Sequence, residues 1–460
     1  MDALLRKHKE LERHQIFLAR SNELNDPMEG YKDVVWQGDA VLWENLLRHY
    51  VLALLTVNMQ CVLMGNDGAF EEPRIPAALT QDDLPTDAFR VLYNDACHDF
   101  FNRPGPSSLC ARLTALRNPL RREGIRFVLS LIHAEAFAAV TSLLVARGLI
   151  NSEAAKVLPK STALDAVFKP FTDESQVPNV DLETIALIAN RTREDLALRS
   201  LFERENTGAN AAARKAMFLA FTFPDRYVHG VVEGLVYPEW RTACFSKTCT
   251  NASSWAAYAQ EHTGAALVFR PRVENGQPYL PLTGVIGTSG GVGQPSRKIR
   301  GPIKGGLAAV TYSNRPPEVD FFQSLGTLPR PKLERAWHCN REGTRSPVID
   351  AALKDDTAWR AAYWASFNRI ATTKLEDWKH EEEYRIVLSD FLGLHAQSAD
   401  ALVEYDFSCL VGVVFGLRTG EHDKLEVMKL IAADCARTGR KDFEFHHVLY
   451  QPSKGCLVRV

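Results

Sequence analysis

Lys374-Leu-Glu-Asp-Trp-Lys-His-Glu-Glu-Glu-Tyr-Arg-Ile-Val-Leu388 is the stretch that decides the fold. It begins with a polar, helix-compatible run and ends in an apolar run that predicts a strand, so three carboxylates stand where one element becomes another. Side chains alternate across an extended segment, which places Glu381, Glu383 and Arg385 on one face. The alternative interpretation is a solvated charge run before a buried strand. The rest of the sequence has to decide between the two.

Length and charge set the broad class of the chain. Its 460 residues are enough for two or three domains, and 54 Lys and Arg against 56 Asp and Glu give a net charge of -2. A nucleic-acid partner would therefore have to bind locally. No apolar run reaches the roughly 18 residues that span a bilayer, and the first residues lack an apolar signal core. We expect a cytoplasmic protein without a membrane partner.

The nine cysteines predict reduced thiols and no metal site. They are scattered, odd in number and include no Cys-x-x-Cys pair. The dipeptides Cys97-His98 and His338-Cys339 have no second pair at the spacing of a zinc finger. We therefore expect no metal ligands.

The first half of the chain changes from a short strand to a long helical block. A strand over Ile16 to Ala19 precedes a turn at Asn25-Asp26-Pro27. Apolar residues at helical spacing then predict an all-helical domain over 41–235, inserted between residues 1–40 and 236–460 of an α+β domain. His133 lies on an apolar helix face, which favours a core histidine with satisfied hydrogen bonds.

The second half predicts strands with helices between them. Trp240 to Ser246 is typical of a strand, and Asn251 or Ser253 is expected to cap a short helix that Gly264 ends. On that helix Trp255, Tyr258 and His262 share one face, which suits core packing or a ligand platform. The Gly-rich segment Leu282 to Gly306 lacks a phosphate-binding motif and predicts a mobile loop. Further strands are expected at Leu307–Tyr312, Ser408–Gly416, Phe443–Tyr450 and Cys456–Val460, with helices at Asp350–Thr373 and Glu421–Ala436.

Four landmarks occur in one order along the chain. They are Leu24-Asn-Asp-Pro-Met-Glu29, Cys244-Phe-Ser246 with Trp255, Tyr258 and His262-x-Gly264, then Trp378-x-x-Glu381-x-Glu383-x-Arg385, and Val413-Val-Phe-Gly416. This pattern resembles the bacterial family catalogued as domain of unknown function 2971, which in turn is similar to the ADP-ribosyltransferase fold. The resemblance implies a split antiparallel sheet that holds NAD in a cleft, interrupted here by a large all-helical insertion.

The resemblance also implies roles for particular residues. Glu383 would bond the 2'-hydroxyl of the nicotinamide ribose and stabilise the positive charge that develops as the glycosidic bond breaks. Glu381 would orient or deprotonate the acceptor, and Ser246 would position Glu383 or the ribose. Tyr258 or Trp255 would stack on nicotinamide. The residues expected to bind NAD are Tyr258, Trp255, Phe245, Arg385, His262 and Asn25.

One element of the family pattern is missing. Family members carry an aromatic-x-Tyr strand before Asn-Asp-Pro, and the first strand of the fold supplies an Arg or His that grips NAD. Three explanations stay open: the chain starts at an internal position, His14 or Arg20 substitutes, or NAD binding is degraded.

Three functions follow as hypotheses. The first is an NAD-consuming enzyme, an ADP-ribosyltransferase acting on a protein or nucleic-acid acceptor or an NAD glycohydrolase, in a bacterial toxin or antiviral defence effector. The second is a non-catalytic module that binds a nucleotide or a partner, with the helical domain as the contact for a regulator. The third is a nuclease with a divalent ion at Asp377, Lys379, Glu381 and Glu383, whose spacing departs from the usual Asp…Glu-x-Lys pattern.

Overall fold

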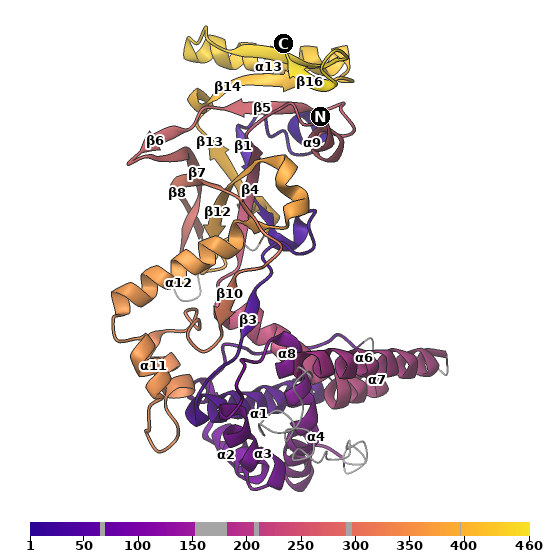
Figure 1. The fold of residues 1–460 in the computed structure, drawn as a ribbon, viewed down its shortest axis with the longest axis vertical. Helices are drawn as coiled ribbons and strands as arrows, with labels where there is room; N and C mark the ends of the chain where they lie inside the picture. Colours follow the sequence, from indigo (N-terminus) through magenta and orange to yellow (C-terminus); the bar gives the residue numbers. More distant parts are fainter. Residues whose placement is uncertain (65–69, 152–181, 207–210, 291–296, 396) are drawn as a thin grey trace. The chain divides into compact units, whose positions relative to one another are not determined.

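The computed structural model describes residues 1–64, 70–151, 182–206, 211–290, 297–395 and 397–460. The chain forms two compact units. The first unit combines Met1–Tyr31, Glu239–Pro317 and Phe367–Val460, and the second combines Lys32–Pro238 with Glu318–Ser366. Both helices and antiparallel sheets are present, as Figure 1 shows, so the predicted α+β class is confirmed.

The first unit is built on an eight-stranded sheet. Its strand order is β1-β13-β7-β8-β12-β4-β2, with β6 paired to β7, and neighbouring strands are antiparallel. The strands are β1 (Gln15–Phe17), β2 (Ala19–Arg20), β4 (Trp240–Ser246), β6 (Arg272–Glu274), β7 (Gln277–Ser289), β8 (Arg297–Ala309), β12 (Glu383–Ser389) and β13 (Leu402–Tyr405). The predicted strand over Trp240 to Ser246 therefore lies beside β12.

A second sheet of the same unit has the order β16-β15-β14-β5. It consists of β5 (Ala265–Phe269), β14 (Leu410–Phe415), β15 (Glu444–Gln451) and β16 (Cys456–Arg459). Helix α13 (Glu421–Thr438) joins the parallel pair β14 and β15, and it ends at Gly439, whose φ of 70° suits glycine. One apolar core joins the sheets, since Ile386 and Val403 of the first and Val413 of the second belong to the same buried cluster as Ile431 of α13.

The prediction of a mobile loop over Leu282 to Gly306 was wrong for the residues that the structure describes. The flanks of the segment lie in β7 and β8, two strands of 13 residues each that pair with one another. Gly284 stands opposite Gly301 in this ladder, and a Cβ on Gly284 would lie 2.8 Å from Ile303. Glycine here allows close packing inside a sheet rather than a loop. Residues 291–296 lie outside the described part.

The second unit is mainly helical, as predicted for 41–235. Its helices are α1 (Ala40–Leu63), α2 (Asp87–Phe101), α3 (Pro104–Thr114), α4 (Arg122–Ala146), α6 (Leu182–Asn206), α7 (Ala211–Met217), α8 (Phe223–Val231), α10 (Arg330–Leu333), α11 (Pro347–Ala352) and most of α12 (Asp356–Ala371). Two short strands, β3 (Asp33–Val35) and β10 (Glu318–Asp320), pair in parallel. His133 is buried, with bonds to Tyr50 and to the carbonyl of Leu219.

Residues 318–366 group with the helical unit, although the sequence analysis assigned them to the C-terminal domain. Aromatic packing explains the difference. Phe321 stacks on Trp36 with ring centroids 5.3 Å apart, and Phe322 meets the edge of Trp43 at 5.4 Å. Because Trp36 and Trp43 lie near the start of the helical unit, the pairing partners are far apart in sequence and no local pattern indicates them.

Helices α1 and α4 are long and apolar enough, by length and composition alone, to cross a membrane. This finding corrects the expectation that no segment meets that criterion. Within the most apolar window of each helix, 67% and 61% of the residues are buried inside the protein. Buried core helices pass the same test, so the two helices are weak evidence for a membrane location.

Candidate active site

The two glutamates are brought together by a turn rather than by a continuous strand. The 3-10 helix η8 (Glu376–Glu381) ends at Glu381, and β12 begins at Glu383. Between them Glu382 has a left-handed backbone with φ 46°, an unusual conformation for a residue with a side chain. Glu381 and Glu383 are buried and Glu382 is exposed. The shared face predicted for Glu381 and Glu383 therefore arises from this backbone reversal.

Arg385 holds Glu383 from the same face of β12. Its Nε donates to Oε1 of Glu383 at 2.6 Å, and its Nη2 donates to Oε2 at 3.1 Å. The other side of the guanidinium binds Glu29 through both carboxylate oxygens, at 2.6 and 2.7 Å, and donates to the carbonyl of Ala371 at 2.9 Å. Arg385 is fully buried. The two-pronged contacts fit the planar fork of a guanidinium.

Lys374 links all three buried carboxylates. Its Nζ lies 2.6 Å from Glu381, 3.3 Å from Glu383 and 3.6 Å from Glu29. It also lies 4.5 Å from the centre of the Trp378 ring, a cation–π contact. We call the set Glu29, Lys374, Glu381, Glu383 and Arg385 the ion cluster. Three acids against two bases leave one excess negative charge when all five are ionised.

Burial and pairing compete in setting the charge of the cluster. Burial raises the pKa of Glu383, but the hydrogen bonds and the charge of Arg385 outweigh it, so the pKa falls below its ordinary value. For Glu29 burial is the stronger effect, and its pKa is raised despite the contacts with Arg385. Burial alone would lower the pKa of Lys374, yet its bond to Glu381 raises it. Glu383 is therefore held as a carboxylate, and Lys374 as a cation.

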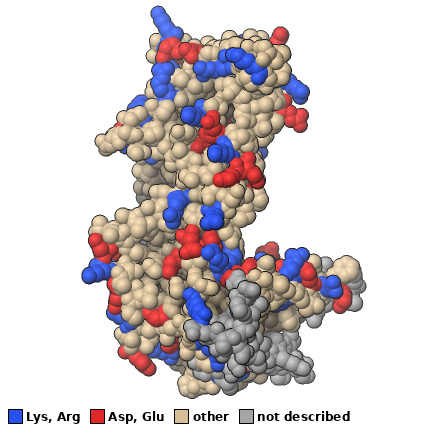
Figure 2. Space-filling model, viewed as in Figure 1, with Lys and Arg blue, Asp and Glu red and all other residues tan. Residues whose placement is uncertain are grey.

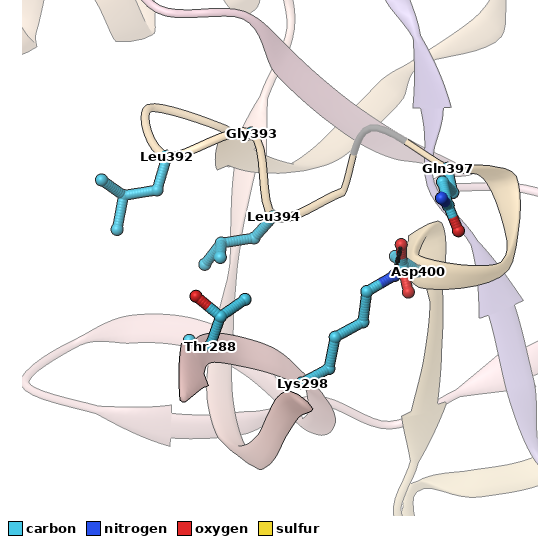
Figure 3. Close-up of a pocket in the computed structure, with 8 residues that line it drawn as sticks. Thr288, Lys298, Leu392, Gly393, Leu394, Gln397 and Asp400 are labelled. Atoms are coloured by element: carbon cyan, nitrogen blue, oxygen red, sulfur yellow. Dashed lines mark hydrogen bonds and ion pairs between the residues drawn. The ribbon is translucent and has the colours of Figure 1, made fainter. Parts of the chain in front are cut away.

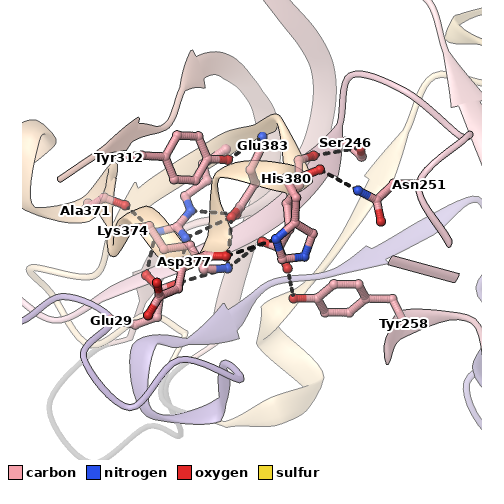
Figure 4. A network of polar contacts seen from close by, with 12 residues as sticks. Glu29, Ser246, Asn251, Tyr258, Tyr312, Ala371, Lys374, Asp377, His380 and Glu383 are labelled. Carbon is pink, nitrogen blue, oxygen red and sulfur yellow. Dashed lines mark hydrogen bonds and ion pairs between the residues drawn. The ribbon is translucent and has the colours of Figure 1, made fainter. Parts of the chain in front are cut away.

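Tyr258 connects the cluster to the surface. Its hydroxyl donates to Oε1 of Glu381 at 2.6 Å, while 56% of the residue is exposed. Burial of the hydroxyl and its bond to Glu381 raise the pKa of Tyr258, so it stays protonated and donates. The side chain of Asn25 also bonds Tyr258. The structure thus brings Tyr258 and Asn25, both expected to bind NAD, next to Glu381, as Figure 4 shows for Tyr258.

Hydrogen bonds from three neighbouring segments fix the turn between the glutamates (Figure 4). The Ser246 hydroxyl donates to the backbone carbonyl of Glu381 at 2.9 Å, and the Asn251 amide donates to that of His380 at 2.7 Å. The Tyr312 hydroxyl accepts from the backbone N–H of Glu383 at 2.8 Å. Tyr312 belongs to β9 (Thr311–Tyr312), which pairs with β11 (Thr373–Lys374). Ser246 therefore positions the backbone of Glu381 rather than the Glu383 side chain.

Two predicted NAD-binding residues, Trp255 and Phe245, pack in the core. Trp255 is 4% exposed, donates to the carbonyl of Cys249 and packs in the core beside the second sheet. Phe245 packs edge-on against Phe269 at 5.9 Å, because it points to the opposite face of β4 from Ser246. The backbone of His262 lies in a turn with φ 71°, and its carbonyl accepts from the N–H of Arg418. Its side-chain Nδ1 is buried without a hydrogen bond to the described residues, so the expectation that it binds NAD stays a prediction.

Arg385 also differs from its prediction as an NAD-binding residue. Its five N–H groups meet two carboxylates and one carbonyl within the protein, which leaves no donor for a ligand. His14, proposed as a substitute NAD grip, bonds Asp434 of α13 at 2.8 Å and stacks on Phe407. Arg20 lies in β2, opposite Arg241 of β4.

The sequence analysis assigned no role to Glu29, Lys374 or Tyr312. Glu29 does close the first landmark, and Lys374 opens the stretch that decides the fold, so both stood in motifs without a function. No pattern in the sequence indicates that Arg385 pairs with Glu29. The burial of Arg385 is what requires carboxylate partners, and it is known only from the structure.

The geometry gives the metal-dependent nuclease no support. Asp377 and Lys379 are exposed, and Lys374 stands between Glu381 and Glu383 where an ion would have to bind both. Among the described residues, one group has ligand atoms close enough to hold a metal, namely His422, Asp423 and Glu426. Asp423 is already paired with Arg6 at 2.6 Å. Such exposed acidic groups are common without an ion.

A cavity of about 480 Å³ lies elsewhere in the first unit, as Figure 3 shows. Its lining includes Thr288, Lys298, Leu394 and Asp400, and the Lys298 amine is bonded to Asp400. None of the residues predicted for the site line this cavity.

No protein-family model, curated protein or solved structure matches the chain. The arrangement of the site residues is therefore the basis for assigning a function.

Proposed function

We propose that the protein is an NAD-consuming enzyme, which transfers ADP-ribose to a protein or nucleic acid or hydrolyses NAD. The observation that carries the proposal is the pair Glu381 and Glu383, buried side by side and held by one lysine. The order of the four landmarks supports it through the resemblance to the ADP-ribosyltransferase fold. The antiparallel sheets joined by one core, with β12 between β8 and β4, suit the split sheet of that fold.

The charge of Glu383 suits the step that breaks the bond between nicotinamide and ribose. Positive charge develops on the ribose in that transition state, and a carboxylate fixed in advance stabilises it without reorganisation. The lowered pKa of Glu383 keeps it ionised at neutral pH. Arg385 and Lys374 supply three bonds to this carboxylate, which has about four acceptor positions. The Cys244 thiol bonds the remaining position, so a ribose hydroxyl would take the place of this weak donor.

Glu381 suits the second role, that of orienting the acceptor. It accepts one bond from Tyr258 and one from Lys374, so about two acceptor positions are unused. The exposed ring of Tyr258 is the part of the site that can stack on nicotinamide. The proposal thus assigns NAD to the surface formed by Tyr258 and Asn25, above Glu381 and Glu383. With this activity we propose a cytoplasmic toxin or defence effector.

Release of nicotinamide from NAD by the purified protein tests the proposal. Glu383→Gln should lower the rate about 100-fold or more, because one preorganised charge is removed while the shape is kept. Glu382→Gln is the matched control: it makes the same chemical change one residue away on an exposed side chain. Equal rates for the wild type and Glu383→Gln would exclude this site.

A second candidate is a non-catalytic module that binds a nucleotide or a partner at the same surface. The observation that favours it is the pairing of all five charged residues inside the ion cluster, which is also how a purely structural network is arranged. Calorimetry separates the two. Binding of NAD without nicotinamide release would support the module, and turnover would exclude it.

A further inference from the structure

Helix α6 has two faces with different surroundings. One face contacts its own unit: Asn190 donates to the carbonyl of Glu123 in α4 at 3.0 Å, and Arg193 donates to Asp225 in α8 at 2.5 Å. Leu182, Ala186 and Asn190 on this face are buried. Figure 1 shows that α6 extends beyond the group formed by helices α1, α2, α3 and α4. Figure 2 shows both basic and acidic side chains on this extending part of the unit, and the large apolar side chains on the other face of α6 are exposed.

The outer face carries large apolar side chains at helical spacing. Leu187, Arg191, Asp195, Leu198 and Phe202 follow steps of four, four, three and four residues, so they form one stripe. Leu187 is 57% exposed, Leu198 66% and Phe202 65%. Ile188, which flanks the stripe, is 63% exposed. Exposed apolar residues that share one face in this way mark an interaction surface more often than isolated ones do.

Two residue pairs on this face are symmetric about position 193. Ile188 and Leu198 each lie five residues from it, and Arg191 and Asp195 each lie two residues from it. The two ends are apolar, and the centre carries one positive and one negative charge. Reversing the helix direction about this point thus exchanges Ile188 with Leu198 and Arg191 with Asp195, while Leu187 and Phe202 come opposite Arg199 and Thr184.

We propose that α6 is a dimerisation helix, whose outer face binds α6 of a second copy of this chain in antiparallel orientation. A two-fold axis beside residue 193 places Ile188 of one copy by Leu198 of the other, and Arg191 by Asp195. Such an interface is isologous and uses one patch on both copies. Within one copy Arg191 already lies 3.5 Å from Asp195, so both side chains reach the centre of the stripe.

The size of the stripe sets the strength of the dimer. From 187 to 202 the helix rises about 23 Å at about 1.5 Å per residue, so one helix face buries less than the 1,200 Å² of a standard interface. A dissociation constant in the micromolar range follows, with the charge pairs setting direction and register more than affinity.

Sedimentation equilibrium of the full chain from about 5 to 200 µM tests the dimer. The wild type should dimerise in this range. Arg191→Asp places two acids opposite each other, and Asp195→Arg places two bases opposite each other, so each variant alone should raise the dissociation constant at least tenfold. A 1:1 mixture of these two variants should dimerise again, because every acid then faces a base of the other copy.

The substituted side chains are exposed, so the variants should keep their helices. Circular dichroism checks this. Leu198→Glu, which removes apolar contact at the stripe, should also abolish the dimer. The proposal is overturned if the wild type stays monomeric at 200 µM. The stripe would then have to bind a different protein. The proposal is equally overturned if both single variants dimerise like the wild type, or if their mixture does not.

Discussion

The two units differ in the polar groups that they bury. The first buries five charged side chains in the ion cluster. The second buries mainly neutral groups: Tyr50 bonds His133 at 2.7 Å, and Tyr227 bonds His49 at 2.8 Å, although Lys32, paired with Glu233, is buried there as well. Burial lowers the pKa of both histidines to about 4, so they stay uncharged. Neutral pairs satisfy a core at little electrostatic cost, whereas buried ions need excellent pairing. A concentration of paired charge in the first unit is what the proposed activity would require of Glu383.

The largest effect is expected from removing the cation at the centre of the ion cluster. Arg385→Ala leaves Glu29 and Glu383 buried without their main partner, so the free energy of unfolding should fall by about 3–5 kcal/mol. Urea unfolding measures it. Arg300→Ala is the control in the same unit, since Arg300 pairs with Glu404 on the surface and should contribute less than about 1 kcal/mol. Similar losses for the two variants would mean that burial does not set the cost.

The fold around the cluster is more predictable from sequence than the cluster itself. The Asn251 cap, whose side chain accepts from the N–H of Ser254, and the strand before it follow from local residue preferences. Arg385 instead meets Glu29 across 356 positions of the chain. Pairing at that separation leaves no local pattern.

Helical periodicity also did not predict which of two aromatic residues on one helix face is buried. Trp255 and Tyr258 lie on one face of α9 (Ala252–Tyr258), yet the first enters the core and the second stays at the surface. Position along the helix decides this difference, because the second sheet covers Trp255. Spacing alone gives the shared face but not what covers each end of it.

The helical unit should lose stability as the pH falls, because its buried histidines are neutral in the folded state. The pKa of His133 is about 4 in the folded state and near 6.5 when unfolded, so the unfolded chain takes up a proton first as the pH falls. The stabilisation is complete above pH 6.5 and is lost towards pH 4. Between pH 6.5 and pH 4, each of His49 and His133 should lower the free energy of unfolding by about 3 kcal/mol.

Hydrogen exchange of peptides from α1 and α4 at pH 7 and pH 5 measures this loss in the helical unit alone. His133→Gln should weaken the protein at pH 7 and also flatten its pH dependence, because the titrating group is gone. His422→Gln, with an 89% exposed side chain, is the control and should change neither. Equal protection at pH 7 and pH 5 would show that these histidines do not set the acid sensitivity of the unit.

The smallest change in stability is expected for a variant of the first unit that should alter activity instead. Tyr258→Phe keeps the exposed ring and removes only the hydroxyl that donates to Glu381, so the free energy of unfolding should change by less than about 1 kcal/mol. Nicotinamide release should fall roughly tenfold, since Glu381 loses one of its two bonds. Trp255→Phe should do the reverse: it removes the core bond to Cys249 and lowers stability while turnover per folded molecule is unchanged. If Tyr258→Phe lowers stability and leaves turnover intact, the tyrosine supports the fold, and the site of NAD binding has to be sought elsewhere on the ion cluster.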